Sequence, residues 1–284
     1  MTASASTIGI DRRADHCCVA HVDGQLPDRR VVALETMPLS EMPERLTPEG
    51  SQITIGLPDS DVIVKNLFFE PAARWDVSLL GQFELSRSLL DDADEFALSM
   101  IPTGKAGRYF GLAVRHRRAE AFAQTILADY CPPLPVRYEM RAAALANGYL
   151  HFCRHDPAHL VCLADIGDGA ISVCFAHHDH IVGLATIPIR GLDPSNSADA
   201  QEIAVTLSTV VNFKLTALAA EVTAPLSALL VSGSTDGSML MSALTRYWPT
   251  QVSLPCIDPE RLHLSSPAAG PIENYLVAMG LAVE

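Results

Sequence analysis

Three short loops of the sequence carry aspartate, glycine and serine in patterns that suit phosphate and divalent cations. In the most informative stretch, residues 161–175, an apolar run ends in Asp165, and Gly167 and Gly169 follow before a second, alternating run. Glycine lets the backbone turn tightly and approach a ligand. The amides of such a turn form a concavity for phosphate, and a carboxylate at a strand end can hold a hydrated cation. An ordinary hairpin is the alternative, because short glycine motifs often match by chance. The stretch predicts a strand, a turn and a strand with the outline of a nucleotide site.

The other two loops also follow apolar runs. Asp11 closes the apolar stub 7–11 and precedes a polar bend, while the loop 231–237 contains Gly233 and Gly237 between a buried strand and a helix. The start of a helix attracts anions because its first amides are unpaired. We therefore expect the three loops to share one site, with the two aspartates facing each other across a cleft.

The order of the elements suggests two related halves. A strand that ends in aspartate, a bend and two further strands occur near the N-terminus and again from residue 161. Strict alternation of apolar residues between turn signals predicts these strands, and apolar residues at helical spacing predict the helices between them. We expect an α/β protein with one half in residues 1–145 and the other in residues 146–284.

A compact insert of about residues 62–135 interrupts the first half. Its expected elements are strands 62–69, 95–101 and 109–114 and helices 74–90 and 117–130. Glu139 is expected at the start of an alanine-rich helix, 139–149, directly before the Asp165 loop. Further helices are expected at 39–46, 203–218, 240–247 and 272–283.

Composition limits the classes of protein. The chain has 284 residues, of which 49% are hydrophobic and 19% charged, as in a packed globular protein. No apolar run approaches the roughly 20 residues that span a bilayer, and no signal peptide is recognisable. Seven cysteines without a CxxC pair indicate buried thiols in a reducing compartment. The net charge of -13 disfavours nucleic acid and favours basic or neutral partners. We expect a cytoplasmic protein without direct membrane insertion.

Three rival sites are less convincing. His155 and His159 have metal-ligand chemistry, but Pro157 between them breaks a shared helical face. Residues 177–180 contain three histidines where a hairpin turn is expected. Residues 232–234 read Ser-Gly-Ser, which is not the GxSxG pattern of a serine hydrolase.

The order of the Asp11, Asp165 and 231–237 loops resembles the actin-like ATPase superfamily, in which two phosphate loops, a connecting helix and an adenosine loop line a cleft. Within it the chain most resembles the PilM-like family of type IV pilus assembly proteins, which is related to FtsA and to the cytoplasmic domain of GspL. The return strand 185–192 and the closing segment 274–282 match as well. The resemblance implies an actin-like (ribonuclease H-like) duplicated fold with a small inserted α+β subdomain.

The resemblance also implies roles for residues of the cleft, with ATP and Mg²⁺ as the cofactors. Asp11 and Asp165 would hold Mg²⁺ through water, and Glu139 would orient the attacking water if the protein is an active ATPase. The glycines that would let the backbone approach phosphate and base are Gly167, Gly169, Gly233 and Gly237.

Several residues depart from the family pattern. Arg12 and Arg13 stand where the family has small residues, Ala170 replaces a hydroxyl, and Ser234 stands in place of the second glycine of the adenosine loop. Phosphoryl transfer depends on positioned phosphate and metal contacts. We therefore expect a degenerate nucleotide cleft with weak ATP binding and little or no ATPase activity.

The function implied by the resemblance is a cytoplasmic scaffold of a type IV pilus or a related secretion machine, peripheral to the inner membrane through its partner. The partner would be the cytoplasmic tail of a single-span inner-membrane protein, bound between the first half and its insert. An acidic protein should favour a tail with Arg or Lys. A homo-oligomer is also possible.

Two alternatives remain. The first is an active actin-like ATPase or a sugar-kinase-like phosphotransferase, because the fold does not decide between these activities. The second is the cytoplasmic part of a GspL-type protein, which the absence of an apolar membrane segment disfavours.

Overall fold

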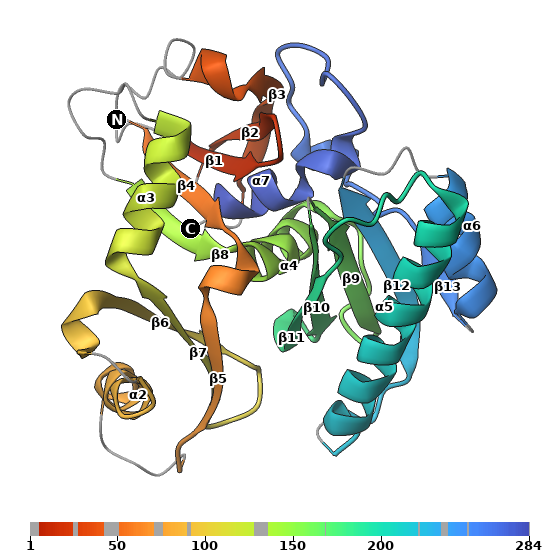
Figure 1. Cartoon of the computed structure of the whole chain (residues 1–284). Coiled ribbons are helices and arrows are strands. Elements are labelled where there is room, and N and C mark those ends of the chain that lie inside the picture. Colours follow the sequence, from red (N-terminus) through yellow and green to blue (C-terminus); the bar gives the residue numbers. More distant parts are fainter. Residues whose placement is uncertain are drawn as a thin grey trace.

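The computed structural model contains two five-stranded sheets of identical design and a smaller three-stranded sheet (Figure 1). It describes residues 6–24, 28–42, 51–70, 76–89, 92–127, 136–167, 169–220, 222–233, 238–248 and 250–283 of the chain.

The first large sheet has the strand order β3-β2-β1-β4-β8. Its strands are β1 (Ser6–Arg12), β2 (His16–Asp23), β3 (Arg30–Pro38), β4 (Gln52–Leu57) and β8 (Val136–Met140). β1, β2 and β3 form an antiparallel meander, and β4 and β8 continue the sheet in parallel with β1.

The second large sheet repeats this plan with the order β11-β10-β9-β12-β13. Its strands are β9 (Leu160–Ile166), β10 (Ala170–His177), β11 (His180–Pro188), β12 (Leu226–Gly233) and β13 (Gln251–Ser253). β9, β10 and β11 are again antiparallel, and β12 and β13 are parallel. The predicted duplication of an α/β unit is therefore confirmed.

Helices cover both faces of each large sheet (Figure 1). They are α3 (His116–Leu127), α4 (Arg141–Phe152), α5 (Ser197–Leu218), α6 (Ser238–Tyr247) and α7 (Leu276–Leu281). α4 and α7 lie between the two sheets, α3 packs on the outer face of the first sheet, and α5 and α6 pack on the outer face of the second. None of the helices in the described ranges has the length and apolar character needed to cross a membrane.

Strand alternation decides which side chains enter each layer. In β1, Ile8 and Ile10 belong to the outer core beneath α3, so the intervening Gly9 faces α7. A Cβ on Gly9 would lie 2.0 Å from the carbonyl oxygen of Ala278 in α7. This glycine therefore allows the C-terminal helix to rest directly on the strand.

The insert forms the three-stranded sheet, with the order β5-β7-β6. Its elements are β5 (Ile63–Phe68), α2 (Val77–Ser86), β6 (Phe96–Pro102) and β7 (Arg108–Arg115), followed by α3. α2 packs on one face of this sheet, with Leu85 against Gly111. The other face is turned toward the two large sheets.

Several predicted boundaries are corrected by the structure. Glu139 does not start a helix but lies in β8, whose residues alternate between polar and apolar, and the alanine-rich helix begins at Arg141. Because alanine favours helices, the sequence predicted one helix from residue 139 and the short strand β8 was missed. The boundary expected at residue 145 falls inside α4, and the helix expected over 272–283 is a 3-10 turn followed by α7. The short strand β13 was not predicted.

Candidate functional site

Asp11 and Asp165 meet at the centre of the molecule because of strand periodicity. Asp11 lies near the end of β1, two residues after Gly9, and so faces α7 and the interior between the sheets. Asp165 has the equivalent place in β9, two residues after Leu163 of the same interior core. Both are buried, with exposures of 0% and 1%. The two aspartates were expected to lie close together, and the contacts below place them in one buried cluster.

Arg13 bridges the two aspartates. Its Nη2 atom lies 2.7 Å from Asp11 Oδ2, and its Nη1 and Nη2 atoms donate to the two carboxylate oxygens of Asp165 at 3.0 and 3.1 Å. Nη1 also donates to the carbonyl of Ile166. The fork of the guanidinium thus occupies the space between the carboxylates.

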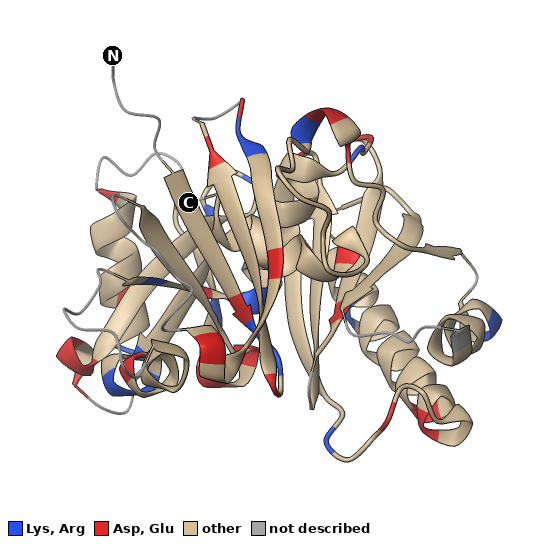
Figure 2. Ribbon diagram, turned by 90° about the horizontal axis from the view of Figure 1, so that it is seen from above, with Lys and Arg blue, Asp and Glu red and all other residues tan. Residues whose placement is uncertain are grey.

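Arg141, the first residue of α4, forms a second bridge. Its Nε atom lies 2.9 Å from Asp11 Oδ1, and its Nη2 atom lies 2.8 Å from Asp165 Oδ2. Two arginines and two aspartates therefore form a neutral cluster, called here the arginine cluster. Blue and red segments adjoin near the centre of Figure 2, where the two halves of the molecule meet.

The charges of the arginine cluster stabilise one another. Burial alone would raise the pKa of Asp165, but Arg13 and Arg141 lower it below its ordinary value. Burial would likewise lower the pKa of Arg13, yet Asp11 and Asp165 raise it above its ordinary value. Both shifts favour the charged forms of Arg13 and Asp165, so this pair stabilises its own ionised state.

Two of the predicted phosphate-loop glycines make room for this cluster. A Cβ on Gly167 would lie 2.7 Å from Nη1 of Arg141, and one on Gly233 would lie 2.9 Å from Asp165 Oδ1. Gly233 also has a φ of 94°, which favours glycine. The open faces that would admit a phosphate are here filled by the side chains of the arginine cluster.

The remaining predicted residues of the cleft are Gly169 and Gly237. Gly169 has a φ of 77° and borders the cavity beside the cluster, where the nearest atom to an added Cβ belongs to Arg190 at 3.7 Å. Gly237 lies outside the described residues.

A cavity of about 460 Å³ borders the arginine cluster. Four arginines line it, namely Arg12, Arg13, Arg141 and Arg190. Asp59 also lines this cavity. Its Oδ1 atom accepts a hydrogen bond from the backbone amide of Ala142 at 3.0 Å, and this bond caps the start of α4. Burial raises the pKa of Asp59.

This geometry does not fit a magnesium nucleotide. A hydrated Mg²⁺ needs carboxylate oxygens that face a water-filled space. The oxygens of Asp11 and Asp165 instead face guanidinium groups, and Asp165 Oδ1 also accepts from the hydroxyl of Ser232 at 3.0 Å. We derive no catalytic step through a metal at this site.

Glu139 lies away from the arginine cluster, in a groove between the insert and the first sheet. Its Oε1 atom accepts from Nδ2 of Asn147 at 2.9 Å. It lines the groove and is not among the residues around the arginine-lined cavity. The role expected from the resemblance, orienting an attacking water, stays a prediction without support from this position.

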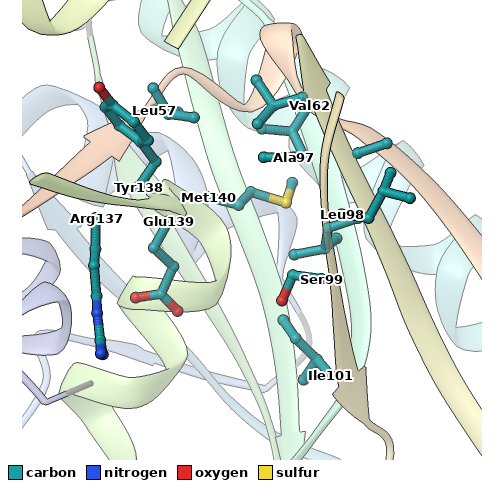
Figure 3. A pocket seen from close by; sticks show the side chains of 13 residues that line it. Leu57, Val62, Ala97, Leu98, Ser99, Ile101, Arg137, Tyr138, Glu139 and Met140 are labelled. Atoms are coloured by element: carbon teal, nitrogen blue, oxygen red, sulfur yellow. The ribbon is translucent and has the colours of Figure 1, made fainter. Parts of the chain in front are cut away.

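This first groove has a cavity of about 250 Å³ and is lined mainly by apolar side chains. Figure 3 shows Ala97, Ser99 and Ile101 of β6 on one side and Glu139 and Met140 of β8 on the other. β6 and β8 end their respective sheets, so each is paired on one side only within the described residues. Their outer edges carry amide and carbonyl groups able to pair with a further strand.

Sequence reasoning missed Arg141, Ser232 and Asp59. A signal existed for Arg141, because a cation in the first turn of a helix opposes the helix dipole and so indicates a local anionic partner. The pairing of Ser232 with Asp165 follows from the β12–β9 register, which the sequence does not give. Among rival residues, His155 pairs with Asp179 in a turn, and the described residues contain no group of three metal ligands.

The two large sheets of identical strand order, with helices between them and on their outer faces, have the fold of actin-like ATPases. A chain of the PilM–PilN type IV pilus biogenesis complex superimposes with a TM-score of 0.71, at 16% sequence identity, over 98% of each chain. The cytoplasmic domain of EpsL, an inner-membrane component of the type II secretion system of Vibrio cholerae, superimposes with a TM-score of 0.50 at 11% identity. That alignment covers 98% of this chain and 95% of the EpsL domain.

Searches against protein-family models and against curated proteins give no match. At these sequence identities the structural likeness establishes the fold, and the function has to be argued from the sites.

Proposed function

We propose that this protein is a cytoplasmic scaffold of a type IV pilus or a related secretion machine. In this proposal it binds the cytoplasmic tail of a single-span inner-membrane partner in the first groove and stays peripheral to the membrane through that partner. The observation that carries the proposal is the apolar groove between two edge strands, β6 and β8, beside a cleft occupied by the chain's own arginines.

The first groove suits an extended peptide for two reasons. A peptide strand can satisfy its backbone groups on an edge strand, while alternate side chains enter pockets along it. The lining supplies apolar surface from Leu57, Val62, Ile101 and Met140 for such side chains. The insert of about residues 62–135 is, in this proposal, a binding module of the first half.

Electrostatics favour a basic tail. The whole chain has a net charge of -13, while the groove lining itself carries one carboxylate, Glu139, and one guanidinium, Arg137, so the preference for a basic tail rests on the net charge of the chain. Complementary charge accelerates encounter and discriminates between partners more than it adds affinity. We therefore expect the tail to combine apolar residues with Arg or Lys.

The fold neighbours supply the biological context. One is a chain of a pilus biogenesis complex and the other a domain of a secretion component, and each superimposes over nearly its whole length. The alternative of an active ATPase or sugar-kinase-like phosphotransferase is weakened by Arg13 and Arg141, because their guanidinium groups occupy the carboxylates that a metal would need.

A peptide-binding experiment tests the docking proposal. A labelled peptide of the cytoplasmic tail of the single-span membrane protein encoded beside this chain is titrated with the full chain, and its fluorescence anisotropy is followed. Ser99→Trp adds a bulky side chain on β6 inside the groove and should weaken binding by about tenfold or more.

Two matched variants serve as controls. Ser242→Trp makes the same change on an exposed position of α6, and Arg190→Gln alters the cleft cavity. Neither should change the affinity. No binding by the wild type, or binding lost with Arg190→Gln but retained with Ser99→Trp, contradicts the docking proposal.

Calorimetry with Mg-ATP tests the degenerate cleft separately. We expect weak or undetectable heat of binding and little turnover. A sub-micromolar affinity, or turnover near the enzyme median of about 10 per second, would favour the ATPase alternative.

A further inference from the structure

A second groove lies at the opposite edge of the insert's sheet, along β5. It has a cavity of about 460 Å³ and is lined by residues of β5, β7, β11 and α5. The same face of the three-stranded sheet contributes to both grooves, with Ser99 and Ile101 of β6 in the first and Val64 and Phe68 of β5 in the second. The second groove is therefore a separate surface, to which the proposed tail docking gives no role.

The second groove is bounded by two edge strands. β5 ends the three-stranded sheet and β11 ends the second large sheet, so within the described ranges each is paired on one side only. Soluble proteins usually protect such edges with charges, prolines or bulges, because an unprotected edge pairs with other strands. β5 has the sequence Ile-Val-Lys-Asn-Leu-Phe and contains a single charge.

Large apolar side chains are exposed along this groove. Val64 and Phe68 of β5 line the groove and are 38% and 64% exposed, and Phe213 on α5, which is outside the lining, is 73% exposed. Phe213 lies four residues before Ala217, which lines the groove, so both residues occupy the same helical face. Clustered exposed side chains of this kind mark interaction surfaces more often than isolated ones do.

The charge of the second groove is opposite to that of the protein. Its lining contains Arg108 and Lys214 and no acidic residue among those described, although the chain carries a net charge of -13. The Arg108 guanidinium lies 5.8 Å from the centre of the Phe68 ring, which places a cation beside the exposed aromatic surface.

We propose that the second groove binds an extended protein segment that carries Asp or Glu next to aliphatic or aromatic residues. The backbone of this segment pairs with the β5 edge, its apolar side chains contact Val64, Phe68 and Ala217, and its carboxylates lie near Arg108 and Lys214. In these proposals the protein carries two peptide grooves of different charge preference, at the two edges of one sheet of the insert.

A random twelve-residue peptide library displayed on phage tests this inference. The library is selected on the full wild-type chain and counter-selected on Lys214→Glu, which reverses one charge of the groove. We expect the enriched peptides to be acidic and apolar, and to bind Lys214→Glu about tenfold or more weakly than wild type. Val64→Asp, which places a carboxylate on the β5 edge, should weaken the same peptides.

Arg246→Glu is the matched control, because it makes the same change of charge on an exposed position of α6. It should leave the affinity unchanged, as should Ser99→Trp in the first groove. Failure to enrich acidic peptides, or equal binding to wild type and Lys214→Glu, overturns the inference and leaves the tail-docking proposal untouched.

A second copy of the chain is the competing occupant. Sedimentation velocity over a range of concentrations distinguishes it, since we expect the free protein to show no self-association through this groove. A dimer that Val64→Asp dissociates would show that the groove is a self-interface and would overturn the proposal of a separate acidic partner.

Discussion

At the scale of single residues, the arginine cluster fills the space between Asp11 and Asp165 with side chains of the chain itself. Asp11 and Asp165 would repel each other in a dry interior unless cations lay between them. Arg13 and Arg141 provide two positive charges, so the cluster is neutral and each carboxylate is paired twice. The cost of burying four charges is offset only while all four are present.

Replacing Arg13 by methionine should therefore destabilise the protein strongly. Arg13→Met leaves two buried carboxylates with Arg141 as their remaining arginine, and breaking a buried ion pair typically costs about 3–5 kcal/mol. Urea unfolding followed by circular dichroism measures the change.

The control for this experiment is Arg12→Met at the neighbouring position. Arg12 stacks over Phe122 and donates to the hydroxyl of Thr125, contacts that typically contribute about 1 kcal/mol or less. Equal losses for the two variants would show that the cluster contributes little.

Asp59 gives a pH prediction of opposite sign to that of the paired aspartates. Its folded pKa is raised above 3.8 by burial, so its contribution to stability is complete below pH 3.8 and is lost as the pH rises through the folded pKa. Asp59→Asn removes this titration and keeps an oxygen that can accept from Ala142. We expect the variant to gain stability relative to wild type as the pH rises from 4 to 7.

Urea midpoints measured for both proteins across this pH range check the prediction, because the titrations of groups that do not interact with Asp59 are common to both and cancel in the difference. A difference that does not vary with pH would mean that Asp59 keeps an ordinary pKa in the fold.

At the scale of elements, the sequence predicted the strands whose alternation is strict. Each of β1 and β9 carries an aspartate at its second-last position, after alternating residues in β1 and after a continuous apolar run in β9. From these patterns we expected the two loops to meet. β8 was missed because five residues next to an alanine-rich helix give a weak signal. The partners of the aspartates were missed for a different reason. Arg141 reaches them through the tertiary packing of α4. Its place in the first turn of a helix indicates an anionic partner but does not say which one.

The crossing of α4 and α7 depends on glycine. A Cβ on Gly280 would lie 1.7 Å from the carbonyl oxygen of Ala144, and one on Gly148 would lie 2.1 Å from that of Leu276. Backbone atoms cannot move aside as a flexible side chain can. The two helices that separate the large sheets are therefore in direct backbone contact at this point.

Gly280→Ala should push these helices apart. We expect a loss of about 1–3 kcal/mol, or more if the sheets must move with the helices. Gly270→Ala is the matched control, because no atom lies within 4 Å of its added Cβ. Thermal unfolding of both variants measures the effect, and equal melting temperatures would contradict the close packing of α4 on α7.

At the scale of the whole molecule, the arginine cluster ties the two large sheets together. Arg13 follows β1 of the first sheet, Asp165 belongs to β9 of the second, and Arg141 starts the helix between them. In an actin-like fold with a nucleotide, the ligand would make this connection. Here Arg13 and Arg141 make this connection. Under the two proposals above, the grooves beside the insert are the surfaces that bind partners.

Hydrogen exchange measured by mass spectrometry distinguishes a self-closed cleft from one that awaits a nucleotide. In wild type, millimolar Mg-ATP should leave exchange unchanged in the turn 12–16 and around 165–170, because Arg13 and Arg141 already occupy the carboxylates.

Asp165→Asn removes the charge that both arginines share across the sheets. We expect faster exchange in both turns, while the three-stranded sheet of the insert stays as protected as in wild type, since no cluster residue belongs to it. Increased protection of the wild-type turns with Mg-ATP would mean that the cleft opens to accept a nucleotide. If Asp165→Asn accelerated hydrogen exchange equally in the insert, the cluster would support the whole fold and would not be a local connection between its halves.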